Sequence, residues 1–446
     1  MDTPTTLSDL LPQRVELPEI PTDLLDPATD GRNLDIALAT VPAKPAVYAL
    51  LDHAGRPILL SSTANLRMGL LRRCTLPSAE EFHRRRTDYR QITRWVDYRR
   101  VSSTFAANLW FLRVARLLYP DRYRKRLAWK MAWGVMVDLQ AEFPQLLAVS
   151  AARAPIGQWL GPFPDAVSAR QAIHVLEDTF DLCRYYDVIR EAPHGKPCAY
   201  KQMGKCPAPC DGSTTLAEYR RSMRSAVEFL VGSEAGLDVH GMAAAAVRQT
   251  WRQAQQLQMR SAAAKLDFLT AARIKSRIGA AASLSGEKMA HVHRLSGLKF
   301  LILQPGETPS WIEPFFFQAG NIVVGEPVRK KQVTSTLAHW CHQINTSLPV
   351  ADGSRDDPAD LVSLLCYHLF RSRDSGLYIA ADEPLQVQAL ADRLSAWWAQ
   401  KPRSSDNMEQ SSDSAEALDP GPTAGQPRLP MDQDGPNRPP HGRGTW

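Results

Sequence analysis

The sequence predicts a multidomain protein of α/β and all-α parts. We expect a small α/β module, a helical region with a cysteine motif, a helical hairpin, a truncated second α/β region and a disordered tail. The 446 residues exceed the size of one ordinary domain. Short apolar runs beside Gly55 and between residues 297 and 324 are typical of strands, whereas the apolar residues between them recur at helical spacing. A hydrophobic content of 44% with 22% charged residues is ordinary for a chain that buries globular cores.

The first 40 residues form a lead-in punctuated by prolines, and residues 41–130 form the α/β module. Here AVYALLD predicts a strand, HAGRP a turn around Gly55 and ILLSS a second strand, and ANLRMGLLRRC predicts the helix that follows. Apolar residues then recur at helical spacing over 103–118 and over 125–143.

Residues 131–235 form the predicted helical region, and residues 236–290 the predicted helix pair. GPFP is a strong helix stop, and the amphipathic segment after it predicts a helix over 165–182. A loop-like segment with cysteines follows over 183–212. Helices are then predicted over 217–230 and over 242–278, the second of which is rich in Ala, Gln and Arg.

Residues 291–400 form the second α/β region, and residues 401–446 the tail. LKFLIL, PFFFQAG and NIVVGEP predict three strands. A helix over 334–345, another after a polar break, a strand LYIAA and a last helix over 385–398 complete the region. The tail is dominated by Pro, Ser, Gly, Asp and Gln, so we expect it to be disordered.

Composition and local motifs exclude several protein classes. No apolar run approaches the roughly 18 residues that a membrane span needs. The start, MDTPTTLSDLLPQRVELPEI, lacks the basic beginning and apolar core of a secretory signal. Seven cysteines in so long a chain do not make a disulfide scaffold. No G-x-x-x-x-G-K-[ST] loop is present, which argues against a nucleotide cofactor. We therefore expect a cytoplasmic protein that contacts no membrane.

The net charge of +6 is unevenly distributed. Between Arg84 and Lys130, 14 Lys and Arg residues stand against 3 acidic residues, with aromatic residues between them. A basic face with flat rings suits phosphate neutralisation and base stacking, which predicts contact with DNA without sequence preference. The alternative is a solvated face whose arginine stems cover apolar surface. The candidate DNA-binding residues are Arg84, Arg85, Arg86, Arg90, Arg94, Arg99, Arg100, Arg124, Lys125 and Arg126.

Three thiols lie within 13 residues at Cys198, Cys206 and Cys210. Thiolates suit soft ions, so this spacing predicts an iron–sulfur (4Fe–4S) cluster or zinc. Neighbouring lysines favour the thiolate form. A fourth ligand is needed, and Cys183 is the nearby candidate. The alternative is three small buried residues in a turn braced by prolines.

These segments resemble, in the correct order over about residues 40 to 395, the family of the bacterial excinuclease subunit UvrC, a nucleotide-excision-repair nuclease. PAVYALLDHAGRPILLSSTANLRMGLLRR resembles its GIY-YIG nuclease module, and KPCAYKQMGKCPAPCDG its cysteine motif. AAAKLDFLTAARIKSRI resembles the UVR helix pair that docks on the partner UvrB, and residues 297–395 resemble the start of its RNase H-like half. The resemblance implies an iron–sulfur cluster, although one family cysteine falls on Tyr186.

GIY-YIG chemistry needs a tyrosine network to activate water, an arginine to steady the phosphate and a glutamate to hold a divalent metal. Tyr48 and Asn65 remain as vestiges of this site. The other positions carry no suitable group: Leu59, Gly69 and Phe111 or Leu112. Because such groups act as a unit, we expect the module to be nuclease-dead. The family's second nuclease centre and helix-hairpin-helix clamp fall where this chain is Pro-rich, so we expect neither incision activity.

The UVR-like helix keeps the apolar positions through which the family docks on UvrB or on another helix pair. The candidate partner-binding residues are Leu266, Phe268, Ala271, Ala272 and Ile274, several of which share one helix face. Two acidic positions of the family have become Leu269 and Ser276, which removes charges that set partner choice. The alternative is an ordinary helical hairpin without a foreign partner.

These observations favour a UvrC-like repair protein that binds DNA and a protein partner as an adaptor or regulator. Two other functions stay open. The first is a metal-dependent endonuclease with relocated catalytic residues, for which His83, Asp88 and Tyr89, or His174 and Glu177, are conceivable. The second is an iron–sulfur sensor that uses the nuclease-like module only as a scaffold.

Overall fold

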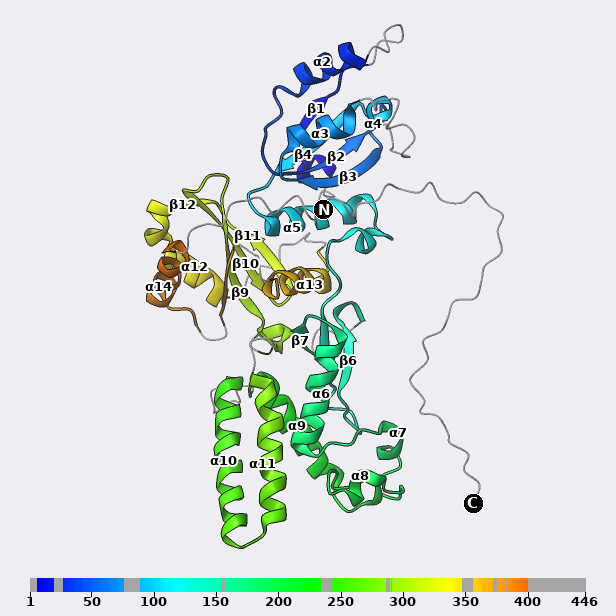
Figure 1. The fold of residues 1–446 in the computed structure, drawn as a ribbon, viewed down its shortest axis with the longest axis vertical. Helices are drawn as coiled ribbons and strands as arrows, with labels where there is room; N and C mark the ends of the chain where they lie inside the picture. Colours follow the sequence, from blue (N-terminus) through cyan, green and yellow to red (C-terminus); the bar gives the residue numbers. More distant parts are fainter. Residues whose placement is uncertain are drawn as a thin grey trace, which may run out of the picture.

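The computed structural model confirms the mixed α/β and helical multidomain class (Figure 1). It describes residues 6–19, 27–75, 89–153, 158–233, 243–285, 289, 291–346, 356–371, 376–381 and 384–399. The predicted disordered tail, 401–446, lies outside the described residues. Within them, no helix combines the length and the apolar character that are needed to cross a membrane.

The N-terminal module is built on a four-stranded antiparallel sheet in the order β1-β4-β2-β3. Its strands are β1 (Gln13–Glu16), β2 (Ala46–Leu51), β3 (Pro57–Thr63) and β4 (Trp95–Arg100). The first 40 residues, which the sequence presents as a lead-in, are part of the module. They supply its edge strand β1 and helices α1 (Leu7–Leu10) and α2 (Pro27–Leu38).

The two faces of this sheet are covered by different helices. Side chains alternate along a strand, so Tyr48 and Leu50 of β2 point to one face and Val47 and Ala49 to the other. The Tyr48 face packs with residues of α3 (Leu66–Cys74) in one apolar cluster. The Val47 face packs with residues of α5 (Thr104–Leu118) in another.

The middle of the chain contains a second antiparallel sheet, in the order β6-β5-β7-β8. The predicted helix over 125–143 is wrong, because β5 (Trp133–Met136) lies there. Gly134 permits the close approach of the Trp159 indole, since an added Cβ would lie 2.2 Å from its Cε2 atom. The other strands and the covering helices are β6 (Leu147–Ser150), β7 (Trp159–Phe163), β8 (His293–Arg294), α6 (Ala166–Phe180) and α9 (Leu216–Val231).

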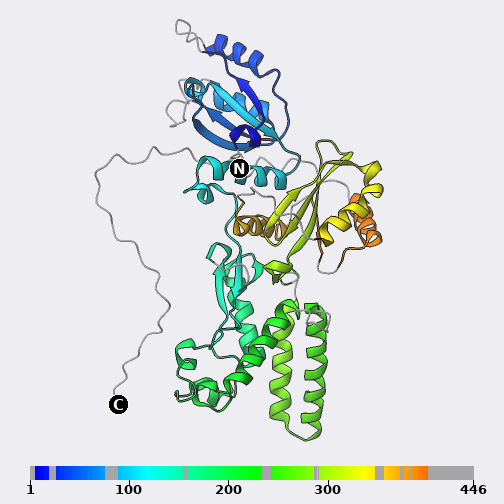
Figure 2. The ribbon, with the colours of Figure 1, turned by 180° about the vertical axis from the view of Figure 1, so that it is seen from behind.

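The predicted helix pair is present as α10 (Ala244–Ala264) and α11 (Phe268–Ala282). The chain turns between them at Leu266, whose φ of 59° lies in the left-handed region. Both views show the hairpin of α10 and α11 at the end of the molecule opposite the N-terminal module (Figures 1 and 2). Its exposed turn is therefore remote from Tyr48.

The C-terminal region is an antiparallel sheet in the order β11-β10-β9-β13, with the short strand β12 (Val328–Arg329) paired to β10. The strands are β9 (Lys299–Pro305), β10 (Trp311–Gln318), β11 (Asn321–Val324) and β13 (Leu377–Ala380). Helices α12 (Val333–Asn345) and α14 (Val387–Ala399) lie on one side of it, and α13 (Pro358–Leu369) on the other (Figure 1).

The N-terminal module and the C-terminal region share one hydrophobic core, although the sequence suggests separate domains. Buried residues of β2, β3 and α5 belong to the same cluster as residues of β9, β10 and α13. The ring of Phe105 on α5 lies 5.0 Å from Phe315 on β10 and 5.1 Å from His368 on α13, centroid to centroid. Helix α5 is therefore packed between the two sheets.

Candidate functional site

Tyr48, the retained tyrosine, lies in the core of the N-terminal module. It is 1% exposed and stands directly opposite Ser61 on β3 and Tyr98 on β4. Burial raises the pKa of Tyr48, which the nearby Arg73 and the hydrogen bond with Ser61 only partly offset. A buried phenol with a raised pKa is poorly suited to give up its proton.

The two positions to which the resemblance assigns the second tyrosine and the arginine are apolar or small. Leu59 is 5% exposed and belongs to the same cluster as Tyr48. Gly69 is buried on α3, and an added Cβ there would lie 3.0 Å from Oγ1 of Thr63. Neither residue provides a proton donor or a cation beside Tyr48.

Arg73 is a cation beside Tyr48 that the sequence did not point to. Its positive charge lowers the pKa of Tyr48 and partly offsets the effect of burial. Residues four apart on a helix share a face, so Arg73 occupies the side of α3 on which Gly69 lies, one turn later. That i, i+4 relation was the available signal. Arg67, in contrast, donates to the carbonyl oxygens of Val41 at 2.9 Å and Ala39 at 2.7 Å.

The predicted metal-ligand position does not meet Tyr48. Leu112 is 1% exposed and Phe111 packs against the same cluster, which is formed on the Val47 face of the sheet. Tyr48 points to the opposite face. Among the residues that the structure describes, no three His, Cys, Asp or Glu side chains are arranged to hold a metal ion.

Asn65, the second vestigial residue, has a structural role. It is the N-cap of α3, and its side-chain Oδ1 accepts a hydrogen bond from the Met68 backbone N–H at 3.1 Å. Such a cap satisfies one of the free N–H groups in the first helical turn. The position is therefore explained by helix stability.

The two alternative sets of relocated catalytic residues are described only in part. His83 and Asp88 lie outside the described residues, and Tyr89 is buried with Tyr48. On α6, Nδ1 of His174 lies 3.1 Å from Oε2 of Glu177. Burial raises the pKa of Glu177, whereas His174 and Arg184 lower it. Nε of Arg184 is 3.3 Å from the same carboxylate, so Glu177 is held in an ion pair.

Much of the predicted DNA-binding stretch is occupied inside the protein. Arg84, Arg85 and Arg86 lie outside the described residues, and Arg90 is only 2% exposed. Arg99 donates to the Asp9 carbonyl at 2.7 Å and lies 3.9 Å over the Trp110 ring.

The remaining cations of that stretch divide between paired and exposed ones. Arg94 pairs with Glu16, and Arg100 lies 3.5 Å from Glu307. Arg126 stacks over Tyr119 at 4.0 Å, and Lys125 is exposed. DNA binding by this stretch stays a prediction. In the part of the stretch that the structure describes, few cations are exposed and unpaired.

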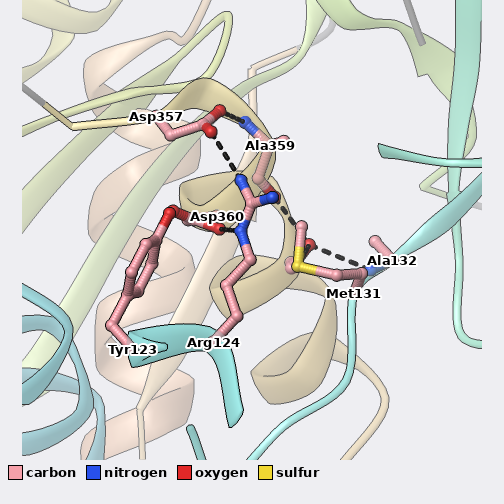
Figure 3. Close-up of polar contacts among 8 residues, drawn as sticks. Tyr123, Arg124, Met131, Ala132, Asp357, Ala359 and Asp360 are labelled. Atoms are coloured by element: carbon pink, nitrogen blue, oxygen red, sulfur yellow. Dashed lines mark hydrogen bonds and ion pairs between the residues drawn. The ribbon is translucent and has the colours of Figure 1, made fainter. Parts of the chain in front are cut away.

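Arg124 joins the N-terminal module to α13, as Figure 3 shows. Its guanidinium contacts the carboxylates of Asp357 at 2.6 Å and Asp360 at 2.9 Å. The hydroxyl of Tyr123 donates to the other oxygen of Asp360 at 2.6 Å. Burial raises the pKa of Asp360, and burial together with that hydrogen bond raises the pKa of Tyr123 to about 12. This polar cluster is a structural clamp.

The cysteine segment brings two thiols into contact. Sγ of Cys183, which follows α6, donates to the Tyr185 carbonyl oxygen at 3.3 Å, and Sγ of Cys206 accepts the Ala208 N–H at 3.4 Å. The proximity of the two thiols raises the pKa of Cys183 and lowers the pKa of Cys206. As the side chains stand, these thiols with Cys198 and Cys210 do not fit a metal ion, because no three ligand groups converge in the described part of the chain. The predicted cluster or zinc stays a prediction.

The UVR-like residues divide into exposed and buried ones. Leu266 is 74% exposed and Phe268 65% exposed, whereas Ile274 is 9% exposed inside the protein. Ala272 is exposed and Ala271 half-buried. Ile274 is buried against its own fold, so its contact with a partner stays a prediction. The exposed residues at the turn form an apolar tip: Leu266, Phe268 and Leu269.

Comparisons with known proteins agree with this arrangement in the middle of the chain. The family profile of the UvrC/Cho excinuclease middle domain matches residues 133–229. These contain strands β5, β6 and β7 of the second sheet, α6, the cysteine segment and α9 up to its last turn. No solved structure matches the chain significantly.

Several curated proteins named UvrABC system protein C are similar over longer stretches. That of Bartonella henselae is 24% identical over 292 residues, which cover 63% of this chain and 40% of that protein. That of Rhodococcus jostii is 27% identical over 248 residues, covering 55% and 32%. That of Moorella thermoacetica is 22% identical over 345 residues, covering 74% and 52%. The chain thus spans between about a third and a half of these relatives.

Proposed function

We propose that this chain, which is similar to UvrC proteins, acts in nucleotide excision repair as an adaptor or regulator that binds DNA and a protein partner without incising DNA. The family relation supports the repair context. The absence of incision and the adaptor role are inferences from the side chains of this particular chain.

The observation that carries the proposal is the location of Leu112. GIY-YIG incision needs a carboxylate that holds a divalent metal beside the tyrosine. Leu112 and Phe111 offer apolar side chains, and they belong to the core on the face of the sheet opposite Tyr48. Leu59 and Gly69 lack the other two functional groups, so three members of one catalytic unit are absent together.

The protein partner is proposed to dock on the apolar tip of the α10–α11 hairpin. Three large apolar side chains are exposed there by between 65% and 74%. An exposed apolar cluster is typical of a protein interaction site. The resemblance favours an apolar helix pair such as that of UvrB as the partner.

A binding experiment tests this function. The full chain and a variant that combines Leu266→Ser and Phe268→Ser are immobilised separately, and purified UvrB is passed over each. We expect at least a tenfold loss of affinity with an unchanged melting temperature, because both side chains are exposed. Met68→Ser, at an exposed apolar residue on α3, is the control and should bind normally. Equal binding by all three proteins would contradict the docking surface.

A further inference from the structure

The α10–α11 hairpin carries an excess of positive charge that its docking role does not require. Between residues 244 and 282, 7 Lys and Arg residues stand against one acidic residue, Asp267. The resulting net charge of +6 equals that of the whole chain. Asp267 is also the N-cap of α11, where its Oδ1 accepts the Thr270 N–H at 3.0 Å.

Some of these cations serve the fold. Arg248 donates to the carbonyl oxygens of Phe229 and Leu230, both at 3.3 Å. Arg277 pairs with Asp181 at 2.6 Å. These contacts attach the base of the hairpin to the middle domain, and they leave the cations farther toward the tip for another use.

Three exposed cations follow α10 toward the tip. Arg252 and Arg260 lie eight residues apart with the exposed Gln256 between them, so these two arginines and Gln256 share one helix face. At 1.5 Å per residue the two arginines are about 12 Å apart along the helix axis. Lys265 is exposed directly after α10, at its C-cap. We call Arg252, Arg260 and Lys265 the α10 stripe.

The α10 stripe lacks counter-ions in the described part of the chain. The ion pairs found there include none of its three residues, whereas Arg94, Arg113 and Arg124 are each paired with a carboxylate. Like charges along one helix repel each other, and a polyanion that replaces their small counter-ions binds with a favourable gain in entropy. The spacing of Arg252 and Arg260 along one helix face suits an extended ligand better than a single small anion.

We propose that the α10 stripe holds the sugar–phosphate backbone of DNA. This inference rests on the proposed function, because it assigns the DNA contact of the adaptor to a surface other than the basic stretch of residues 84–130. The amide of Gln256 is placed to donate to the same backbone. The apolar tip stays available to the protein partner, so one hairpin presents DNA and partner to each other.

The test compares two variants of the full chain that each lose three charges. The first combines Arg252→Gln, Arg260→Gln and Lys265→Gln. The matched control combines Arg122→Gln, Lys130→Gln and Arg153→Gln, which are exposed cations outside the hairpin and outside the set of candidate DNA-binding residues. Binding of labelled duplex and single-stranded DNA is measured between about 50 and about 200 mM salt. Melting temperatures check that both variants fold.

The inference predicts that the stripe variant loses affinity at least tenfold and that its slope of log affinity against log salt falls by about 2 to 3. The control should stay close to the unmodified chain. A loss confined to the control, or equal losses in both variants, would overturn the α10 stripe while leaving DNA binding intact. If both variants bind DNA normally, the stripe serves another polyanion such as an acidic protein face, and the inference fails. An unmodified chain that binds no DNA would instead contradict the proposed function.

Discussion

The guanidinium of Arg124 lies 2.9 Å from the carboxylate of Asp360, and this ion pair joins the segment after α5 to the first turn of α13. Asp360 is fully buried and also accepts the Tyr123 hydroxyl. Since residues 123 and 360 are 237 positions apart in the sequence, the contact fixes the N-terminal module to the C-terminal region. A cation that the sequence assigns to DNA thus holds two regions of the fold together.

Arg124→Gln should destabilise the protein. Removing one partner of a buried ion pair costs about 3 to 5 kcal/mol, but Arg124 is 37% exposed and solvent reduces the loss, so we expect about 2 kcal/mol. The measurement is the free energy of unfolding in urea. Arg122→Gln, at the exposed neighbour, should change it by less than about 0.5 kcal/mol. Equal values for the two variants would show that the clamp contributes nothing.

The buried carboxyl of Glu313 on β10 should make stability depend on pH. Burial raises the pKa of Glu313, partly offset by the hydrogen bond from Ser102. A carboxyl whose pKa is higher in the folded than in the unfolded state favours folding fully below its unfolded pKa of 4.5. This contribution is lost as the pH rises through the folded pKa. Glu313→Gln should therefore gain stability relative to the unmodified chain between pH 4 and pH 8, measured as melting temperature. Parallel curves would be evidence against the raised pKa.

Two glycine substitutions should have opposite effects. Gly134→Ala places a Cβ 2.2 Å from the buried Trp159 indole, so β5 or the ring must move, and we expect a loss of about 2 kcal/mol or more. Gly279→Ala on α11 meets no atom within 4 Å and replaces glycine inside a helix, so we expect a gain of about 0.5 to 1 kcal/mol. Thermal unfolding measures both. A neutral Gly134→Ala would contradict the packing of β5 against β7.

The cluster or zinc predicted at the cysteine segment would require that segment to rearrange, because its thiols do not converge as they stand. We expect chain purified without oxygen to contain iron and sulfide, or zinc, and Cys206→Ser to lose it. Cys183→Ser should lose it as well if the contact of Cys183 with Cys206 marks a fourth ligand. Cys341→Ala, at a core cysteine, is the control. In protein that contains the cluster or zinc, residues 183–212 should resist proteolysis. If the purified protein contains no metal and these residues resist proteolysis equally well, the predicted cluster or zinc is contradicted.

The sequence predicted the elements with strong local patterns. The strands around Gly55, the helix over 165–182 and the three strands after residue 297 are confirmed because their apolar periodicity matches the face that they bury. The helix predicted over 125–143 is wrong because a short apolar stretch fits the period of a helix or of a strand. The packing of Trp159 on Gly134 favours the strand.

The site was less predictable than the fold. The sequence alone shows that Leu59 and Gly69 lack catalytic groups. The proximity of Arg73 to Tyr48 could not be predicted, because it depends on how α3 packs on the sheet. Charge counting also misled over residues 84–130, since Arg90 and Arg99 are occupied by contacts from distant segments. A cation counts as a surface charge only where no carboxylate or carbonyl reaches it.

An incision assay tests the central claim most directly. Purified chain, with and without UvrB, is incubated with nicked, bubble and lesion-bearing DNA in Mg²⁺ or Mn²⁺, beside a Tyr48→Phe variant. The account predicts DNA binding without strand cleavage by either protein. Cleavage that co-purifies with the chain and disappears in Tyr48→Phe would show that the N-terminal module is an active nuclease and would contradict the account.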